Sequence, residues 1–190
     1  DQSDIYVYEL KSRDLVNITD DIYSDHDPQW ERDNRTIYFV SDRRDNPVGT
    51  ANRRYMLIWN YDYHSSDIYS IGIDGRDLTR ITNTPTIIEK SPTPGVGGNL
   101  LYISDRSGIN NIYLRDSSGA TRVLTNSISG IDQLAIASDD SKLLFNAWND
   151  DGYDIFLLRL PFTLKYETDT LPQTKFLDER QVAAGTTSMK

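Results

Sequence analysis

Three short patterns recur in the same order along this chain of 190 residues. The first is an alternating run that opens with Asp or Asn: DIYVYEL (4–10), DIYSIGI (67–73), NIYLRD (111–116) and DIFLLRL (154–160). The second ends in threonine: LVNIT (15–19), LTRIT (78–82) and TRVLT (121–125). The third is an apolar run: RTIYFVSDR (35–43), NLLYISDR (99–106) and SKLLFNAW (141–148).

The spacing of these patterns predicts the fold. Thr82 and Thr125 are 43 residues apart, and so are Asn111 and Asp154. A period of about 40–45 residues that carries four short strands is typical of one blade of a β-propeller. The apolar residues also come in short alternating bursts rather than helical stripes, which favours an all-β chain. Residue pairs that accept positive φ separate the bursts: Asp33-Asn34, Asp74-Gly75, Ser118-Gly119 and Asp139-Asp140.

The order of the patterns resembles the β-propeller repeat of the TolB family, which the N-terminal propellers of tricorn-type proteases share. The first full copy carries the motif residues Thr19, Asp25, Pro28, Trp30 and Asp33, followed by TIYFVSDR. The later copies depart from it, since TPGVGGN replaces the Trp region and Ala135 replaces the Pro. The resemblance covers roughly residues 4–160. It implies that the D-x-x-P-x-W segment is innermost in a blade, followed by the S-D-R, D-I-Y and L-T strands.

We therefore expect TolB-like propeller blades over residues 1–160 and a linker or tail over 161–190, in which TKFL could add a strand. The blades comprise thirteen strands: an outer pair (4–19), two full blades (25–82 and 89–125) and three strands of another (132–160). Propellers typically close with four to eight four-stranded blades, so thirteen strands do not close one. We expect part of a larger propeller, with a ring completed by a second copy as the alternative. Open blade edges also predict self-association.

Residues with catalytic or metal-binding spacing are not apparent in the sequence. Cysteine is absent, which excludes disulfides, thiol nucleophiles and cysteine-bound zinc. The two histidines lack metal-ligand spacing, and no G-x-S-x-G motif occurs. We predict no catalytic residues, no metal and no cofactor.

Several repeated or clustered polar residues have structural interpretations. We interpret the acidic segment around His26 (Asp20, Asp21, Asp25 and Asp27) as a loop whose carboxylates cap turns, with a divalent-cation site as the alternative. NDDGYD (149–154) is interpreted as a turn, and the glycines of PGVGGN as part of an innermost strand. The repeated Asp-Arg of S-D-R should fix turns by hydrogen bonds. The repeated Tyr6, Tyr69 and Tyr113 should pack between blades.

One copy of the repeat is longer than the others. Asp42 and Asp67 are 25 residues apart, whereas the corresponding Asp105 and Asn111 are 6 apart. The added segment has a basic patch (Arg43, Arg44, Arg53 and Arg54) followed by YMLIWNYDYH. Arginines and exposed aromatics are favoured anchors of protein interfaces. We predict a partner-binding surface at Arg53, Arg54, Tyr55, Trp59, Tyr61, Tyr63 and His64, with a taller hairpin packed on its own blade as the alternative. Blade geometry puts this insertion on the same face as the His26 segment.

The functional prediction is a non-enzymatic protein-interaction module or scaffold of a bacterial extracytoplasmic protein, in the periplasm or cell envelope, as the resemblance to TolB implies. Its partner would be another protein or an adjoining domain of the same polypeptide. The alternative is a regulatory or substrate-gating propeller portion of a larger hydrolase, such as a tricorn-like peptidase, with catalytic residues outside this chain. A lyase-type propeller with a central metal is disfavoured, because neither histidine is expected on an innermost strand. The net charge of -9 and pI near 4.6 argue against nucleic acid. No apolar run reaches the roughly 18 residues of a membrane helix.

Overall fold

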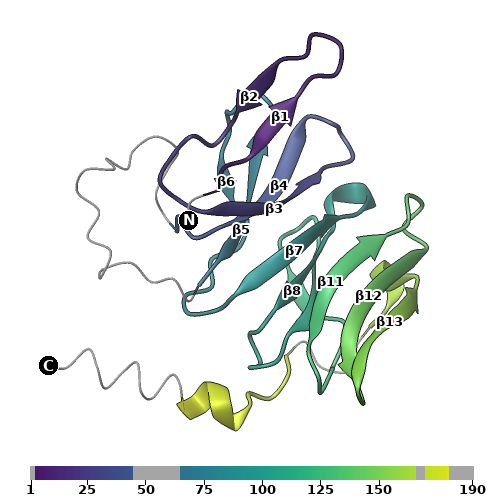
Figure 1. Ribbon diagram of the computed structural model, residues 1–190. Helices are drawn as coiled ribbons and strands as arrows, with labels where there is room; N and C mark the ends of the chain where they lie inside the picture. The colour runs from purple at the N-terminus through teal and green to yellow at the C-terminus, as the bar shows by residue number, and fades with distance from the viewer. Residues whose placement is uncertain (1–2, 45–64, 166–169, 180–190) are drawn as a thin grey trace, which may run out of the picture. The chain divides into compact units, whose positions relative to one another are not determined.

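Thirteen short strands form in the part of the chain that the computed structural model describes, which is residues 3–44, 65–165 and 170–179. They make a two-stranded pair, two four-stranded sheets and a three-stranded sheet (Figure 1). The predicted all-β class and four-stranded blades are confirmed. No helix among the described residues is long and apolar enough to span a membrane. The chain divides into two compact units, residues 1–96 and 97–190.

The first unit contains the strand pair and the first complete blade. The pair is β1 (Tyr6–Tyr8) with β2 (Leu15–Asn17). The blade has the order β3 (Asp25–Trp30), β4 (Thr36–Ser41), β5 (Asp67–Gly72) and β6 (Thr79–Arg80). All neighbouring strands are antiparallel. The sequence motifs therefore occupy the sheet in the order that the resemblance implies.

Alternation along β4 and β5 explains why this blade is buried on both faces. Ile37, Phe39, Tyr69 and Ile71 share one face and pack against Ile5 and Ile18 next to the first strand pair. Val40 and Ile68 point to the opposite face and are fully buried. On that side strand β7 (Glu89–Pro94) contacts β3, β4 and β5.

The hairpin turns use the residues that the sequence predicts. Asn34 and Asp140 have φ of 54° and 58°. The Asp33 carboxylate accepts hydrogen bonds from the N–H groups of Arg35 and Thr36, which satisfies the backbone at the turn. Asp150 and Asp151 form the two-residue connection between paired Asn149 and Gly152, so the predicted turn at NDDGYD is confirmed.

The second unit contains β8 (Leu100–Ser104), β9 (Asn111–Arg115) and β10 (Thr121–Val123), which pair in the order β10-β9-β8. The three-stranded sheet follows as β11 (Ile131–Ile136), β12 (Lys142–Asn149) and β13 (Gly152–Arg159). These two groups of strands share one apolar core: Leu101, Ile103, Ile112, Leu114, Leu124, Ile131, Leu143 and Ala147.

An aromatic pair recurs across the second and third strands of the three larger sheets. The ring centroids are 5.9 Å apart in Phe39–Tyr69, 5.9 Å in Tyr102–Tyr113 and 5.4 Å in Phe145–Phe156. The predicted packing between groups of strands holds for Tyr69, which is 2% exposed and shares an apolar cluster with Ile5 and Ile18. Tyr113 is also 2% exposed, and its ring pairs with Tyr102 of its own sheet. The packing prediction is wrong for Tyr6, which is 55% exposed.

Two local expectations are corrected. The glycine stretch does not belong to a strand, since β7 ends at Pro94 and Val96–Gly98 form the 3-10 turn η2, where Gly97 and Gly98 have positive φ. TKFL does not add a strand. Residues 175–179 are helical, the Thr174 N–H donates to the Ser107 carbonyl at 2.9 Å, and Leu177 is buried. A second 3-10 turn, η3 (Pro161–Thr163), follows β13.

Candidate functional site

Arg43 is fully buried in the first unit, although the sequence had suggested an exposed basic patch. Its two terminal nitrogens donate to Asp21 and Asp25 at 2.9 Å and 2.5 Å, and its Nε donates to Ser41 at 2.9 Å. The guanidinium carbon also lies 5.3–5.7 Å from the ring centroids of Tyr23, Phe39 and Tyr69. This arginine is therefore a structural clamp between the S-D-R turn and the acidic segment.

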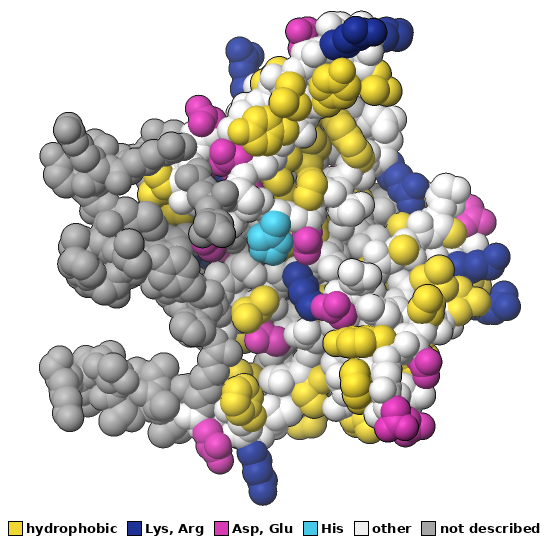
Figure 2. Space-filling view, in the orientation of Figure 1, with side chains coloured by type: hydrophobic (Ala, Val, Ile, Leu, Met, Phe, Trp, Pro, Cys, Tyr) yellow, Lys and Arg dark blue, Asp and Glu magenta, His cyan; other side chains and the backbone are white. Residues whose placement is uncertain are grey.

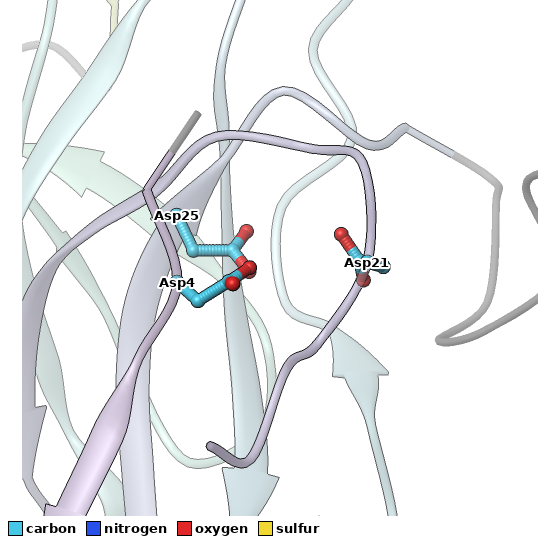
Figure 3. Close-up of side chains that lie close together, drawn as sticks. All are labelled: Asp4, Asp21 and Asp25. Carbon is cyan, nitrogen blue, oxygen red and sulfur yellow. The ribbon is translucent and has the colours of Figure 1, made fainter. Parts of the chain in front are cut away.

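Three carboxylates converge beside this clamp, as Figure 3 shows for Asp4, Asp21 and Asp25. One oxygen atom from each lies within 4.8 Å of the others. Asp4 accepts a hydrogen bond from the Asn17 amide at 2.9 Å, and Arg43 forms an ion pair with each of the other two. Burial raises the pKa of Asp21, while the N–H of Tyr23 and the charge of Arg43 oppose that shift. Since the guanidinium already supplies positive charge here, the arrangement favours the structural interpretation over a cation site.

A polar pocket of about 530 Å³ lies on the same unit. It is lined by Ser24, His26, Asp27, Asp42, Ser65, Ser66, Ile88 and Lys90. Figure 2 shows the histidine, in cyan, with acidic side chains in magenta and basic ones in dark blue close to it. Sequence analysis placed His26 in a loop and away from the innermost strands, but the residue belongs to β3, the D-x-x-P-x-W strand and first strand of its blade. We call this group of residues the His26 pocket.

The charges of His26 and Asp27 are coupled. The His26 Nδ1 lies 3.5 Å from an Asp27 carboxylate oxygen, and the two side chains are 49% and 42% exposed. The hydrogen bond to Asp27 raises the pKa of His26 above its usual value, and the same contact lowers the pKa of Asp27. Asp27 also accepts the Ser91 N–H at 3.2 Å. At mildly acidic pH the pocket therefore presents the His26 imidazolium and the Asp27 carboxylate side by side.

Two strained residues border the pocket. Asp27 and Ser91 have φ of 52° and 53°, and each directly precedes a proline. A non-glycine residue in the left-handed region costs on the order of 1–3 kcal/mol and is found where surrounding structure imposes it, often at functional sites. In β3 the strain accompanies a register shift between His26 and Gln29. It directs the Asp27 carboxylate toward the backbone of β7.

The two ends of the insertion, which we call its roots, lie at this pocket. Ser41 and Asp67 are paired at the last position of the β4–β5 ladder, and Asp42 and Ser65 beyond them both line the His26 pocket. The roots therefore share the face of His26, as blade geometry predicts. The binding residues predicted within the insertion lie outside the described residues: Arg53, Arg54, Tyr55, Trp59, Tyr61, Tyr63 and His64.

Sequence reasoning missed Lys90, Ser91 and Ile88 as neighbours of His26. A signal was present, because Lys90-Ser91-Pro92 occupies the same place in its repeat as His26-Asp27-Pro28. The prolines recur in the two copies, whereas the polar residues before them differ in identity. Chemically, the pocket offers acidic, basic and hydroxyl side chains at the surface, which can donate and accept hydrogen bonds.

Comparisons with known proteins agree on the fold. No protein-family model matches the chain, and a search of curated proteins finds no match. TolB from Acinetobacter baumannii has a TM-score of 0.59 and 18% identity, over 83% of this chain and 35% of that chain. The tricorn protease has a TM-score of 0.58 and 17% identity, over 89% and 20%. A puromycin-hydrolyzing peptidase from Mycobacterium tuberculosis has a TM-score of 0.54 and 14% identity, over 80% and 24%. The chain thus spans about a third or less of the length of these structures.

Proposed function

Since this chain has the TolB-like β-propeller fold, we propose that it is a non-enzymatic protein-interaction module or scaffold of a bacterial extracytoplasmic protein. The observation that supports the proposal is the His26 pocket at the roots of the insertion. Its partner is another protein or an adjoining domain of the same polypeptide. A location in the periplasm or cell envelope belongs to the same proposal, and cell fractionation tests it.

The pocket and the insertion have complementary roles in this proposal. The pocket supplies polar contacts of both charges, which select a partner more than they add affinity. The insertion supplies aromatic and arginine anchors, which usually carry most of the affinity at an interface. The proposed anchors are Arg53, Arg54, Tyr55, Trp59, Tyr61, Tyr63 and His64.

Site-specific photo-crosslinking in the source bacterium tests this proposal. A photoreactive amino acid at Tyr61 should give one discrete adduct, whereas the same group at Ile128 in the second unit, which is 92% exposed, should not. With that partner purified, Trp59→Ala and Tyr61→Ala should each weaken binding about tenfold. Equal adducts at both positions, or unchanged affinity of folded variants, would contradict the proposal.

A second candidate function is a regulatory or substrate-gating portion of a larger hydrolase. It is favoured by the likeness to the tricorn protease and to the mycobacterial peptidase, of which the chain matches 20% and 24%. Labelling the whole protein with a fluorophosphonate probe for active serines tests it. A labelled band that changes in intensity when the His26 pocket is mutated would favour this candidate over the scaffold.

A further inference from the structure

Three D-I-Y strands have their outer edge covered in the same way. The cover is the short L-T strand that follows in sequence: β2 on β1, β6 on β5 and β10 on β9. In each case an isoleucine N–H donates to a threonine hydroxyl, in the pairs Ile5–Thr19 (3.0 Å), Ile68–Thr82 (2.8 Å) and Ile112–Thr125 (2.9 Å). The residue before the threonine donates its N–H to the carbonyl of the same isoleucine. These donors are Ile18 (3.0 Å), Ile81 (2.8 Å) and Leu124 (2.8 Å).

Strand β13 is the fourth member of this series. Asp154 pairs with Ala147 as Asn111 pairs with Ser104, so Ile155 occupies the position of Ile112. The N–H and carbonyl of Ile112 point away from β8 and toward the L-T segment. By the same register, the N–H and carbonyl of Ile155 point away from β12. Among the described residues the sheet has the order β11-β12-β13, and nothing continues it beyond β13. The outer edge of β13 therefore has the geometry that accepts a fourth strand.

The side chains around this edge lack the cover that their counterparts have. Ile155 is 78% exposed and Leu157 is 48% exposed. Their counterparts in the preceding blade, Ile112 and Leu114, are 0% and 2% exposed. This face of the three-stranded sheet is apolar, and an exposed apolar face of this kind marks an interaction surface.

The charged residues near β13 are complementary to the acidic residue that begins two of the L-T segments. Lys142 and Arg159 are cross-strand partners at one end of the β12–β13 hairpin. In the two L-T segments of the first unit an aspartate, Asp14 or Asp77, directly precedes the leucine that begins the pattern. The Asp14 carbonyl accepts the N–H of Glu9, which has the same place in its repeat as Arg159. An acidic residue at that place in a strand on β13 would lie opposite a basic pair.

We propose that the outer edge of β13 is a docking site for one extended segment of the pattern acidic–apolar–x–x–aliphatic–Thr, which adds as an antiparallel fourth strand. Its threonine hydroxyl accepts the Ile155 N–H, and its aliphatic residue donates to the Ile155 carbonyl. Its acidic residue lies beside Lys142 and Arg159. This is β-strand addition, in which backbone bonds give affinity and alternate side chains give specificity. The site belongs to the second unit and is independent of the His26 pocket.

A synthetic peptide copied from the first full blade, RDLTRITNT (residues 76–84), is the probe. It is titrated into the 190-residue chain, and amide hydrogen exchange is followed by NMR. The Ile155 and Leu157 amides should exchange at least about tenfold more slowly at saturation, because a bonded amide must open before it exchanges. The Phe156 amide faces β12 and should not change. That alternation is a signature of strand addition which binding to the sheet face does not produce.

Matched variants test the register. The peptide with Thr82→Val keeps the shape but loses the hydroxyl acceptor, and should bind about fivefold more weakly. A peptide N-methylated at Ile81 should not bind. In the protein, Leu157→Pro removes an outward N–H without removing a bond to β12 and should abolish binding, whereas Leu157→Val should retain it.

Several results would overturn the proposal. One is unchanged exchange at Ile155 and Leu157 at millimolar peptide, and another is equal binding by a folded Leu157→Pro variant. Protection that is present without peptide at all protein concentrations would mean that the chain covers its own edge. Protection that grows with protein concentration would identify a second copy as the occupant.

Discussion

The first unit contains a buried cluster of charges, in which Arg43 forms ion pairs with Asp21 and Asp25. These groups are 0–1% exposed, so none of them can exchange its partner for water. Removing one partner of a buried ion pair lowers the stability of the fold by far more than the pair contributes to it, because the other charge remains buried and uncompensated.

Replacing Arg43 with Gln should therefore lower the free energy of unfolding by about 3–5 kcal/mol. Urea denaturation followed by circular dichroism measures this effect. Arg44→Gln is the matched control, since Arg44 is exposed and bonds to Ser65 at 3.1 Å, and it should cost less than about 1 kcal/mol. Equal losses in the two variants would contradict the clamp.

The His26–Asp27 contact predicts a pH-dependent contribution to stability. The folded pKa of His26 lies above its usual 6.5, and that of Asp27 lies below its usual 3.8. The contribution is therefore present between those two values. It is lost as pH rises through the raised His26 pKa, and as pH falls through the lowered Asp27 pKa.

His26→Gln should lower the melting temperature by about 1–2 °C at pH 5.5, because the pair is half exposed and screened by solvent. The difference should vanish near pH 9. Differential scanning fluorimetry across this range checks both values, and Ser24→Ala in the same pocket serves as the control. A constant difference at every pH would show that His26 contributes by packing alone.

At the level of elements, the outermost strands depend on threonine side chains. Strand β6 has only two residues, yet Thr82 accepts the buried Ile68 N–H at 2.8 Å. Thr82→Val should cost about 1–3 kcal/mol, because it leaves that N–H without an acceptor. Thr79→Val, at an exposed position of β6, should be within about 0.5 kcal/mol of the parent. Chemical denaturation compares the two.

The C-terminal helical segment depends on a glycine. Gly108 has φ of 89°, and a Cβ there would lie 1.9 Å from the Thr174 hydroxyl and 3.2 Å from the Leu177 Cβ. Gly108→Ala should displace residues 174–179 and expose them to protease, which mass spectrometry of limited digests detects. Gly152→Ala, where a Cβ meets no atom within 4 Å, is the control and should leave the digest unchanged.

Elements were more predictable from the sequence than single side chains. Strand ends and turns depend on local periodicity and on residues that accept positive φ, and both are visible in sequence. The burial of Arg43 was not, because it depends on Asp21 and Asp25, which only the folded chain brings around it. The strand position of His26 was missed because a strained residue and a register shift interrupt the alternation at Asp27.

Over the whole molecule, the two ends of the strand series expose apolar side chains. Tyr6 and Tyr8 of β1 are 55% and 53% exposed at one end, and Ile155 of β13 is 78% exposed at the other. The expected self-association through blade edges remains a proposal. Such surfaces nevertheless favour association between copies, since paired edges and buried apolar area both stabilise contacts.

The double variant Ile155→Lys/Leu157→Lys should shift any oligomer toward monomer without lowering the melting temperature, because both side chains are exposed. Analytical ultracentrifugation over a range of concentrations measures the shift. A double variant at exposed sites elsewhere, Ile128→Lys/Val96→Lys, controls for added positive charge. Equal dissociation by both double variants would indicate a charge effect rather than a contact at β13.

The direct pairing of Ser41 with Asp67 has a consequence for engineering. The ladder ends at the same position whether many residues follow, as after Ser41, or few, as after Ser104, which pairs with Asn111. The entropic cost of closing a loop grows only slowly with loop length. The loop at this end of the hairpin can therefore be replaced by loops of other lengths. Foreign loops grafted between Asp42 and Ser65 would be displayed beside a fixed set of polar neighbours, which makes this blade a scaffold for selecting new binders.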